Sequence, residues 1–282
     1  MEVLILGGGV VGVTTAYQLL KDGHQVLVID RLPPGIGGAS YGNAGLIATG
    51  HSIAWGSPKA LKIWFNSLFH QDPVFRMKFQ ADPQFIRWGL KFLFQCTEYK
   101  AKRNSLAKHR ISSYSQKILK EVVEETNIQY ERNANGLIYL YRNSQAMAAS
   151  SSHVRLLQEI GQTLETVEKE RVLEIIPELK DSKDQIAGGV FSPSDESGDS
   201  KIFTEQLMEF CRGMGGTFES GITIERLEAS GTKIKRVVTT VAFSLQIIMY
   251  FVLVPGVHCW YVLPWEFGYL SVRSRGTRLQ FQ

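Results

Sequence analysis

The chain has 282 residues, a formal net charge of +4, 44% hydrophobic residues and 21% charged residues. This composition is ordinary for a globular protein, with length enough for one large domain or two smaller ones. No run of five or six basic residues is present, so nucleic-acid binding is not indicated.

The cysteines and the N-terminus exclude further classes. Cys96, Cys211 and Cys259 are far apart and lack CxxC or Cys/His spacing. This pattern argues against a disulfide framework and against a structural metal site, and it suits a reducing compartment. The first residues have no basic segment before a hydrophobic run, so we expect no secretory signal.

The first thirty residues predict a strand, a helix and a second strand. Val3–Leu6 is a short aliphatic run, typical of a buried parallel strand. Val13–Lys21 predicts a helix whose inner side is Ala16, Leu19 and Leu20, and Asp22-Gly23 ends it. Gln25–Ile29 predicts the second strand.

Between the first strand and the helix lies Gly7-x-Gly9-x-x-Gly12. In dinucleotide-binding folds the three glycines allow a tight turn, close approach of the pyrophosphate, and close packing of helix on strand. The free N–H groups and the positive end of the helix then face the phosphates. Asp30 follows the second strand, where a carboxylate accepts from ribose hydroxyls, which favours FAD or NAD over NADP. A glycine turn in an unrelated α/β protein is the alternative, and the complete strand–glycine–helix–strand–acid context favours the dinucleotide.

The segment 31–50 is dense in Gly, Pro, Ser and Asn and predicts a loop, lying either on a cofactor or simply on the surface. With Ile29-Asp30-Arg31 and Ala39-Ser40-x-x-Asn43-Ala44-Gly45, the chain resembles the FAD-dependent D-amino acid oxidase superfamily, and within it the small subunit of bacterial D-amino acid dehydrogenase. That family has a P-W-x-x-P-G segment next, whereas this chain has Ala54-Trp55-Gly56-Ser57-Pro58.

The resemblance implies that the loop from Ser40 to Leu46 crosses the flavin diphosphate. The FAD-binding residues that we expect are Gly7, Gly8, Gly9, Val10, Val11, Gly12, Asp30, Arg31, Ser40, Asn43, Ala44, Gly45, Leu46 and Ile224.

Aromatic residues are frequent in 59–95. Phe85, Trp88 and Phe92 recur at helical spacing, which favours core or inter-domain packing. A membrane-facing surface with interleaved basic residues is the alternative. The other aromatic residues are Trp64, Phe65, Phe69, Phe75, Phe79 and Phe94, and the basic residues are Lys62, Arg76, Lys78, Arg87 and Lys91.

Residues 101–126 predict a long amphipathic helix, and 144–161 predict another. The buried stripe that we expect on the first is Leu106, Ile111, Tyr114, Ile118, Leu119 and Val122. Strands 129–131 and 136–141 are predicted to pair through the hairpin turn at Asn135-Gly136, and 186–191 is another strand. The segments 136–140 and 188–199 match family patterns of the substrate domain.

Asp195, Glu196 and Asp199 form a carboxylate cluster. Acid/base or metal chemistry is one interpretation. Turn and helix-cap chemistry is favoured, because Asp199-Ser200 precedes a predicted helix, 202–212.

Strands are then predicted at 217–219, 222–227 and 233–240. The resemblance implies that this is a return to the FAD domain, with Ile222–Glu225 near the adenine. The family's A-D-x-x-V-x-A-x-G segment does not follow residue 240. We favour a change of reading frame there, and a membrane anchor over Val237–Val254 is the alternative.

We therefore expect an α/β fold: a Rossmann-like FAD-binding domain of glutathione-reductase type with an inserted α+β substrate domain, incomplete at the C-terminus. The expected ranges are 1–85 and 196–240 for the FAD domain, 86–195 for the substrate domain and 241–282 for a tail foreign to the family.

The function implied by the resemblance is FAD-dependent oxidation of a D-amino acid to an imine, which hydrolyses to a 2-oxo acid and ammonia. Electrons then pass to a quinone or membrane acceptor, and the protein is placed in the bacterial cytoplasm with peripheral contact to the inner face of the membrane. An arginine for the substrate carboxylate is expected but not located, and no catalytic residue is assigned. His51 is the one histidine near the cofactor loop, although a lone loop histidine is more often incidental.

Three alternatives stay open. A relative acting on glycine or sarcosine shares these motifs, an NAD-dependent dehydrogenase shares the glycine turn, and a membrane-anchored remnant would have no activity. We expect the chain as written to be inactive or nearly so.

Overall fold

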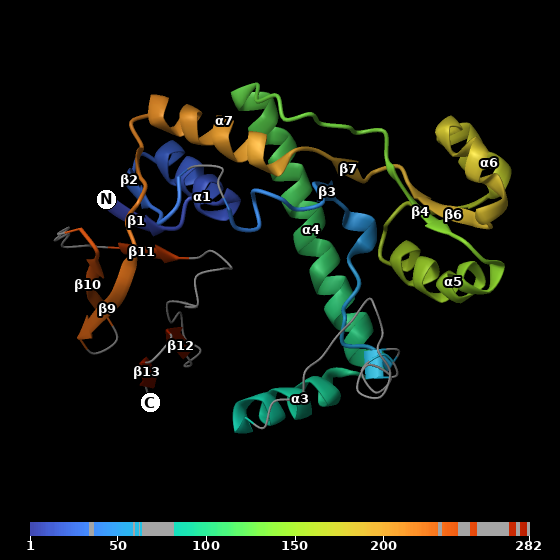
Figure 1. Ribbon diagram of the computed structural model, residues 1–282, viewed down its shortest axis with the longest axis horizontal. Helices are drawn as coiled ribbons and strands as arrows, with labels where there is room; N and C mark the ends of the chain where they lie inside the picture. Colours follow the sequence, from blue (N-terminus) through green and yellow to red (C-terminus); the bar gives the residue numbers. More distant parts are fainter. Residues whose placement is uncertain are drawn as a thin grey trace. The chain divides into compact units, whose positions relative to one another are not determined.

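The computed structural model describes residues 1–33, 37–58, 60–61, 63, 82–230 and 233–241, and strand backbones at 249–252, 271–274 and 277–280. The chain divides into two compact units (Figure 1). Unit 1 comprises 1–46, 122–132 and 198–282, and unit 2 comprises 47–121 and 133–197. Each unit is therefore assembled from segments far apart in the sequence.

A four-stranded parallel sheet forms the centre of unit 1. Its order is β11-β1-β2-β8, with β1 at Glu2–Leu6, β2 at Gln25–Ile29, β8 at Thr217–Glu219 and β11 at Met249–Val252. Helix α1, Val10–Lys21, connects β1 to β2, and α7, Ser200–Gly213, precedes β8. This is the predicted strand–helix–strand start, and the predicted third strand at 217–219 joins the same sheet.

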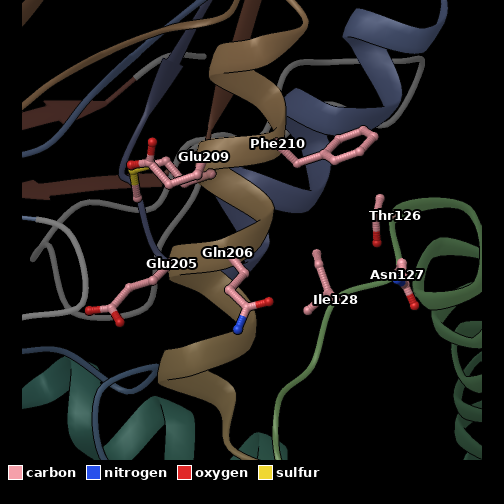
Figure 2. A pocket seen from close by; sticks show the side chains of 8 residues that line it. Thr126, Asn127, Ile128, Glu205, Gln206, Glu209 and Phe210 are labelled. Atoms are coloured by element: carbon pink, nitrogen blue, oxygen red, sulfur yellow. The ribbon is translucent and has the colours of Figure 1, made fainter.

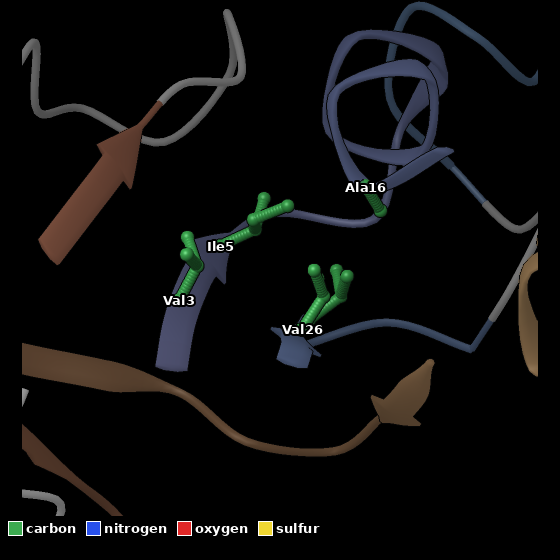
Figure 3. Packing of buried hydrophobic residues seen from close by; sticks show 5 residues of the cluster. Val3, Ile5, Ala16 and Val26 are labelled. Carbon is green, nitrogen blue, oxygen red and sulfur yellow. The ribbon is translucent and has the colours of Figure 1, made fainter. Parts of the chain in front are cut away.

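Successive side chains of β1 point to opposite faces of the sheet, so the core of unit 1 has one part on each face. Val3 and Ile5 pack with Ala16 of α1 and with Val26, as Figure 3 shows. Leu4 lies in a separate cluster that the hairpin of β9, Ile224–Ser230, and β10, Lys233–Thr239, helps to form. Side chains on a strand point alternately to opposite faces, so both faces of this buried strand are covered.

Unit 2 contains a three-stranded antiparallel sheet with helices. The order is β4-β6-β5, with β4 at Leu137–Tyr141, β6 at Gly188–Ser192 and β5 at Glu165–Glu168. The helical segments are α3 at Pro83–Gln95, α4 at Glu98–Thr126, α5 at Ser144–Glu159 and α6 at Lys169–Ile175, with 3₁₀ segments η1 at Thr49–His51 and η2 at Pro177–Gln185. The short strands β3, Leu46–Ile47, and β7, Glu196–Ser197, pair with each other. In unit 1, β12, Ser271–Ser274, pairs with β13, Thr277–Gln280.

The predicted hairpin at Asn135-Gly136 is wrong. Residues 129–131 form no strand, and Glu131 has a positive φ of 54° that interrupts an extended backbone. Strand β4 instead pairs with β6, where Leu137 faces Ser192 and Tyr141 faces Gly188. The Asn-Gly pair therefore marks a turn, but the strand partner comes from a distant part of the chain.

The predicted buried stripe of the long helix is also partly wrong. Ile111 and Tyr114 of α4 are 69% and 65% exposed, whereas Ser105 and His109 are buried. The polar side is buried because the loop after η1 hydrogen-bonds to it: the Ala54 N–H donates to Ser105 Oγ at 2.9 Å. Among the predicted residues, Val122 is buried as expected, at 5% exposure.

Helix α3 contains the described part of the aromatic region. The rings of Trp88 and Phe92 stack with their centroids 5.6 Å apart. The ring centroids of Phe85 and Trp88 are 6.0 Å apart. Trp88 is 52% exposed, so it lies on a helix surface and the core-packing prediction is wrong for it. Trp64, Phe65, Phe69, Phe75 and Phe79 lie outside the described residues.

The C-terminal tail contributes a strand to the central sheet. In β11, Met249 pairs with Val3 and Val252 pairs with Leu6, parallel to β1. No strand was predicted in this tail from the sequence. Within the described residues, no helix combines the length and hydropathy needed to cross a bilayer.

Candidate functional site

The turn between β1 and α1 depends on its first and third glycines. Gly7 has a φ of 111°, a conformation open to glycine, and its N–H donates to the Ile29 carbonyl at 2.8 Å. A Cβ on Gly12 would lie 1.8 Å from the Gly7 carbonyl oxygen. The close packing of helix on strand that the sequence predicted is therefore present.

The loop containing Ser40 reaches the N-terminus of α1. Gly9 is the N-cap residue, and Ser40 Oγ accepts from the N–H of Val10 at 3.0 Å. Asn43 Oδ1 accepts from the Gly45 N–H at 2.7 Å, and Gly45 has a φ of 63°. A Cβ on Gly45 would lie 2.3 Å from the Gly198 carbonyl oxygen, so glycine is required there too.

Asp30 joins the glycine turn to the segment after β2. Its carboxylate accepts from the Gly8 N–H at 2.7 Å and from the Leu32 N–H at 2.9 Å. The backbone of Asp30 is also hydrogen-bonded on both sides. Its N–H donates to the backbone carbonyl of Glu219, and its carbonyl accepts from the Ile222 N–H. The carboxylate thus has a fixed position at the carboxyl end of β2, beside Gly8.

A hollow opens at this end of the sheet and includes residues that the sequence did not suggest. Phe218 and Glu219 end β8 and Ser220 follows it, and the carboxyl ends of β8 and β2 meet because the two strands are parallel. The predicted strand at 217–219 was the available signal, since ligands of open α/β sheets bind at these strand ends. The lining residues are Gly8, Val28, Asp30, Leu32, Pro33, Met208, Phe218, Glu219 and Ser220.

The structure brings together part of the predicted set. The glycines, Val10, Asp30 and Ser40 lie around the start of α1, as the hydrogen bonds above show. Val11 is 47% exposed and Leu46 is 53% exposed. Arg31, Asn43 and Ala44 are also exposed, and Ile224 lies at the start of β9.

A polar contact fixes the outer part of α1. Glu125, in the last turn of α4, accepts from the buried Tyr17 hydroxyl and from Lys21, whose Nζ is 2.6 Å from Oε2. Burial, followed by the hydrogen bond to Glu125, raises the pKa of Tyr17 well above its ordinary value. The hydrogen bonds from Lys21 and then Tyr17 lower the pKa of Glu125. The helix that carries the glycine turn is therefore tied to α4.

A cavity of about 560 Å³ lies elsewhere in unit 1, beside α7 (Figure 2). Glu205, Gln206 and Glu209 line it from α7, and Thr126 and Ile128 line it from the end of α4. None of the predicted cofactor residues contributes to it, so it is separate from the glycine turn.

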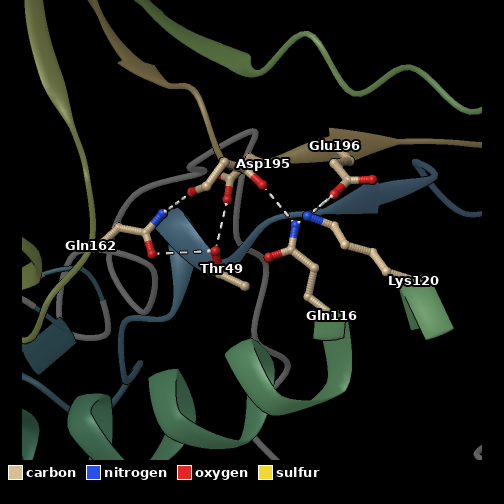
Figure 4. Close-up of polar contacts among 7 residues, drawn as sticks. Thr49, Gln116, Lys120, Gln162, Asp195 and Glu196 are labelled. Atoms are coloured by element: carbon tan, nitrogen blue, oxygen red, sulfur yellow. Dashed lines mark hydrogen bonds and ion pairs between the residues drawn. The ribbon is translucent and has the colours of Figure 1, made fainter. Parts of the chain in front are cut away.

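The three carboxylates of the cluster lie in different environments. Asp199 caps α7, because its Oδ1 accepts from the Ile202 N–H at 2.8 Å, as the sequence predicted. Asp195 and Glu196 are instead buried in unit 2, at 0% and 3% exposure (Figure 4). Glu196 pairs with Lys120 at 2.9 Å, and Asp195 accepts from Thr49 and Gly50, so neither of these two carboxylates caps a helix. The described residues contain no group of His, Cys, Asp and Glu that could hold a metal ion.

Known proteins resemble this chain over most of its length. A family model described as FAD dependent oxidoreductase (DAO) matches residues 2–263. D-amino acid dehydrogenase 2 of Mesorhizobium japonicum is 36% identical over 241 residues, covering 85% of this chain and 58% of that protein. D-amino acid dehydrogenase of Dechloromonas aromatica is 35% identical, covering 83% of this chain and 56% of that protein. The chain therefore spans less than two thirds of the length of these curated relatives.

Solved structures share the fold. A glycine oxidase from Geobacillus kaustophilus aligns with a TM-score of 0.59 at 17% identity, covering 84% of this chain and 51% of that one. L-proline dehydrogenase from P. horikoshii aligns with a TM-score of 0.57 at 18% identity, covering 85% and 49%. The family match extends past residue 240, where the sequence patterns had led us to expect the resemblance to end.

Proposed function

Because this chain belongs to the DAO family of FAD-dependent oxidoreductases, we propose that unit 1 binds FAD and that the protein oxidises D-amino acids. Four curated relatives at 35–37% identity are named D-amino acid dehydrogenase, which supports this substrate class. The observation that carries the proposal is the position of Asp30, whose carboxylate is hydrogen-bonded to the N–H of Gly8 inside the glycine turn.

The residues around the turn fit a dinucleotide. Each carboxylate oxygen of Asp30 accepts one backbone N–H, Oδ2 from Gly8 and Oδ1 from Leu32. An ionised carboxylate oxygen can accept a second hydrogen bond, so both oxygens keep capacity for ribose hydroxyls. The absence of a side chain at Gly8 and Gly9 leaves backbone accessible to a diphosphate.

The start of α1 supplies the electrostatic part of the site. The first turn contains no acidic residue, so no negative side chain opposes a diphosphate there. The free N–H groups and the dipole of a helix N-terminus stabilise such an anion. Ser40 binds the Val10 N–H and so positions its loop at this end of the helix.

FAD, when bound, supplies the redox chemistry by accepting a hydride from the substrate α-carbon. The described residues of this chain bind and orient the dinucleotide. In the reaction that we propose, the substrate amine is neutral when the hydride leaves, and the imine product then hydrolyses to a 2-oxo acid and ammonia. We assign no catalytic side chain.

The electron acceptor that we propose is a quinone or another membrane component, reached through peripheral contact at the inner face of the bacterial cytoplasmic membrane. Helix α3 supports this contact. Trp88, Leu90 and Phe94 are 52%, 52% and 72% exposed, and Arg87 and Lys91 lie exposed on the same helix. Exposed aromatic and basic residues on one helix are typical of an interfacial segment.

We also propose that the FAD-binding part is 1–85 with 196–240 and that 86–195 belongs to the substrate domain. The compact units divide the chain differently, since residues 47–121 belong to unit 2. Proteolysis with and without substrate tests this division. The unit whose peptides the substrate protects from cleavage is the substrate-binding part.

The test is to purify the full chain, add FAD and measure binding by quenching of flavin fluorescence. We expect saturable binding, and then dye reduction with D-alanine in preference to L-alanine, glycine and sarcosine. Faster dye reduction with glycine or sarcosine than with D-alanine would replace D-amino acids as the proposed substrate class. Binding of NADH in place of FAD would refute the proposal, and FAD binding without dye reduction would restrict it to the cofactor.

A further inference from the structure

Asp195 is a fully buried carboxylate to which no role has yet been given. It follows β6, and its carboxylate accepts from the Thr49 hydroxyl at 3.0 Å and from the Gly50 N–H at 2.9 Å. The Tyr139 hydroxyl donates to it at 3.2 Å. Figure 4 shows the Thr49 and Asp195 side chains pointing toward each other. A buried carboxylate bound to a backbone N–H and two hydroxyls is a strong local constraint.

The loop that Asp195 holds is fixed at several further points. The Ser52 hydroxyl donates to the Thr49 carbonyl at 2.5 Å, and Lys108 donates to the Ile53 carbonyl at 3.2 Å. The same Thr49 hydroxyl oxygen lies 3.3 Å from Gln162 Oε1, and the NH₂ group of Gln162 donates to Ser192 and Ser194. The loop from Thr49 to Ile53 thus has one preferred conformation.

Steric fit adds to these bonds. A Cβ on Gly50 would lie 2.7 Å from Asp195 Oδ2 and 2.6 Å from Ser192 Oγ. The loop backbone therefore lies directly against the carboxylate. This explains why the position next to Thr49 has no side chain.

The loop presents a histidine on an aromatic support. The His51 imidazole stacks on the Tyr139 ring, with centroids 5.3 Å apart and planes inclined by 19°. His51 is exposed and is the one ionisable side chain between residues 42 and 58. Asp195 contacts both the hydroxyl of the supporting ring and the backbone next to the histidine, so it constrains the imidazole from two sides.

We propose that Asp195 is a positioning residue: it fixes the loop Thr49–Ile53 and the orientation of the His51 imidazole, and through them the segment that continues from the Ser40–Leu46 cofactor loop. The last part rests on the proposed function, because it assumes that this loop crosses a bound flavin. Leu46 and Gly50 are four positions apart along the chain, so we infer that the loop Thr49–Ile53 restrains the chain that leaves the cofactor loop.

A matched pair of variants tests the proposal without removing the charge. Thr49→Val keeps the shape of the side chain and removes the hydroxyl that Asp195 accepts, whereas Thr49→Ser keeps the hydroxyl. Asp195→Asn changes the carboxylate itself. Asp184→Asn removes an exposed carboxylate of the same unit and serves as the charge control.

Two readouts use the full chain without flavin. In ¹H–¹³C spectra we expect the His51 ring signal, assigned with His51→Gln, to have an upfield ring-current shift from the stacked Tyr139 ring. We expect Thr49→Val and Asp195→Asn to lose it, while Thr49→Ser and Asp184→Asn retain it. Hydrogen exchange of the peptide containing Gly50 should accelerate roughly tenfold in Thr49→Val and Asp195→Asn, as expected for a lost hydrogen bond to a charged group. Equal spectra and exchange in Thr49→Val and Thr49→Ser would overturn the proposal.

The third readout is the dissociation constant of FAD. We expect it to rise roughly tenfold in Thr49→Val and Asp195→Asn and to stay within about twofold in the two controls. An unchanged constant in every variant, with the histidine signal displaced, would overturn the link to the cofactor loop. If the unsubstituted chain binds no FAD, the proposed function fails, whereas the spectra and exchange still decide whether Asp195 positions His51.

Discussion

Replacing Gly12 by alanine tests the glycine turn most directly. The added Cβ would lie 1.8 Å from the Gly7 carbonyl oxygen and 3.0 Å from the Gly7 carbonyl carbon. Contact between a carbon and another heavy atom normally begins near roughly 3.5 Å. Because both Gly7 atoms belong to the backbone, no rotamer change relieves the overlap, and β1 and α1 must move apart.

The expected loss of stability follows from two opposing terms. Alanine gains about 1 kcal/mol over glycine within a helix. Overpacking typically costs about 1–3 kcal/mol, and we take the upper limit because the contact is with backbone. The net loss is about 2 kcal/mol, and at about 2–4 °C per kcal/mol for a protein of this size the Tm should fall by about 4–8 °C.

The assay is thermal denaturation followed by circular dichroism, with Gly213→Ala as the matched control. Gly213 is the last residue of α7, and a Cβ there would meet no atom within 4 Å. Alanine at this position should leave the Tm unchanged or raise it slightly. If Gly12→Ala melts at the same temperature as Gly213→Ala and binds FAD equally well, the close approach of α1 to β1 is not as described.

Three further predictions concern the ribose acid, the α1 contact and the tail. Asp30→Asn should weaken FAD binding by about tenfold to a hundredfold, because it removes the charge from the hydrogen bonds to backbone and ribose. A fluorescence titration checks this, with Asp22→Asn as the control, since Asp22 is an exposed acid at the end of α1. Equal FAD affinities in the two variants would contradict the prediction. The folded pKa of Glu125 lies below its ordinary value of 4.5, so its contribution to stability is present above about pH 4.5 and is lost as the pH falls through the folded value. The drop in Tm between pH 7 and pH 4 should therefore be larger in the unsubstituted chain than in Glu125→Gln, and identical drops would show that the ion pair has no such effect. The frame-change hypothesis predicts that the nucleotide sequence, read in the next frame after codon 240, encodes A-D-x-x-V-x-A-x-G, and its absence there would remove the hypothesis.

Local sequence patterns predicted the start of unit 1 correctly. The apolar runs at 3–6 and 25–29 predicted β1 and β2. The glycines between these runs marked the turn into α1, and Asp30 follows the second run. Strand period, helix period and glycine turns depend on neighbours within a few residues, so they can be inferred without knowing the fold. The Asp199 cap of α7 was predictable for the same reason.

Contacts between distant segments decided the rest. Strand β4 pairs with β6, about fifty residues further along, although a local Asn-Gly turn suggested a hairpin. Ser105 and His109 lie on the buried side of α4, and the loop at 53–54 brings the Ala54 N–H to Ser105, a partner that the helix period does not reveal.

The sequence by itself therefore determined the family and the dinucleotide turn, since both depend on short, contiguous motifs. Only the tertiary structure showed the hydrogen-bond partners of Asp195, because one of them, Thr49, lies 146 positions away. A carboxylate is compatible with a cap, a metal site or a buried network, and which of these it forms depends on the donors that the folded chain brings to it.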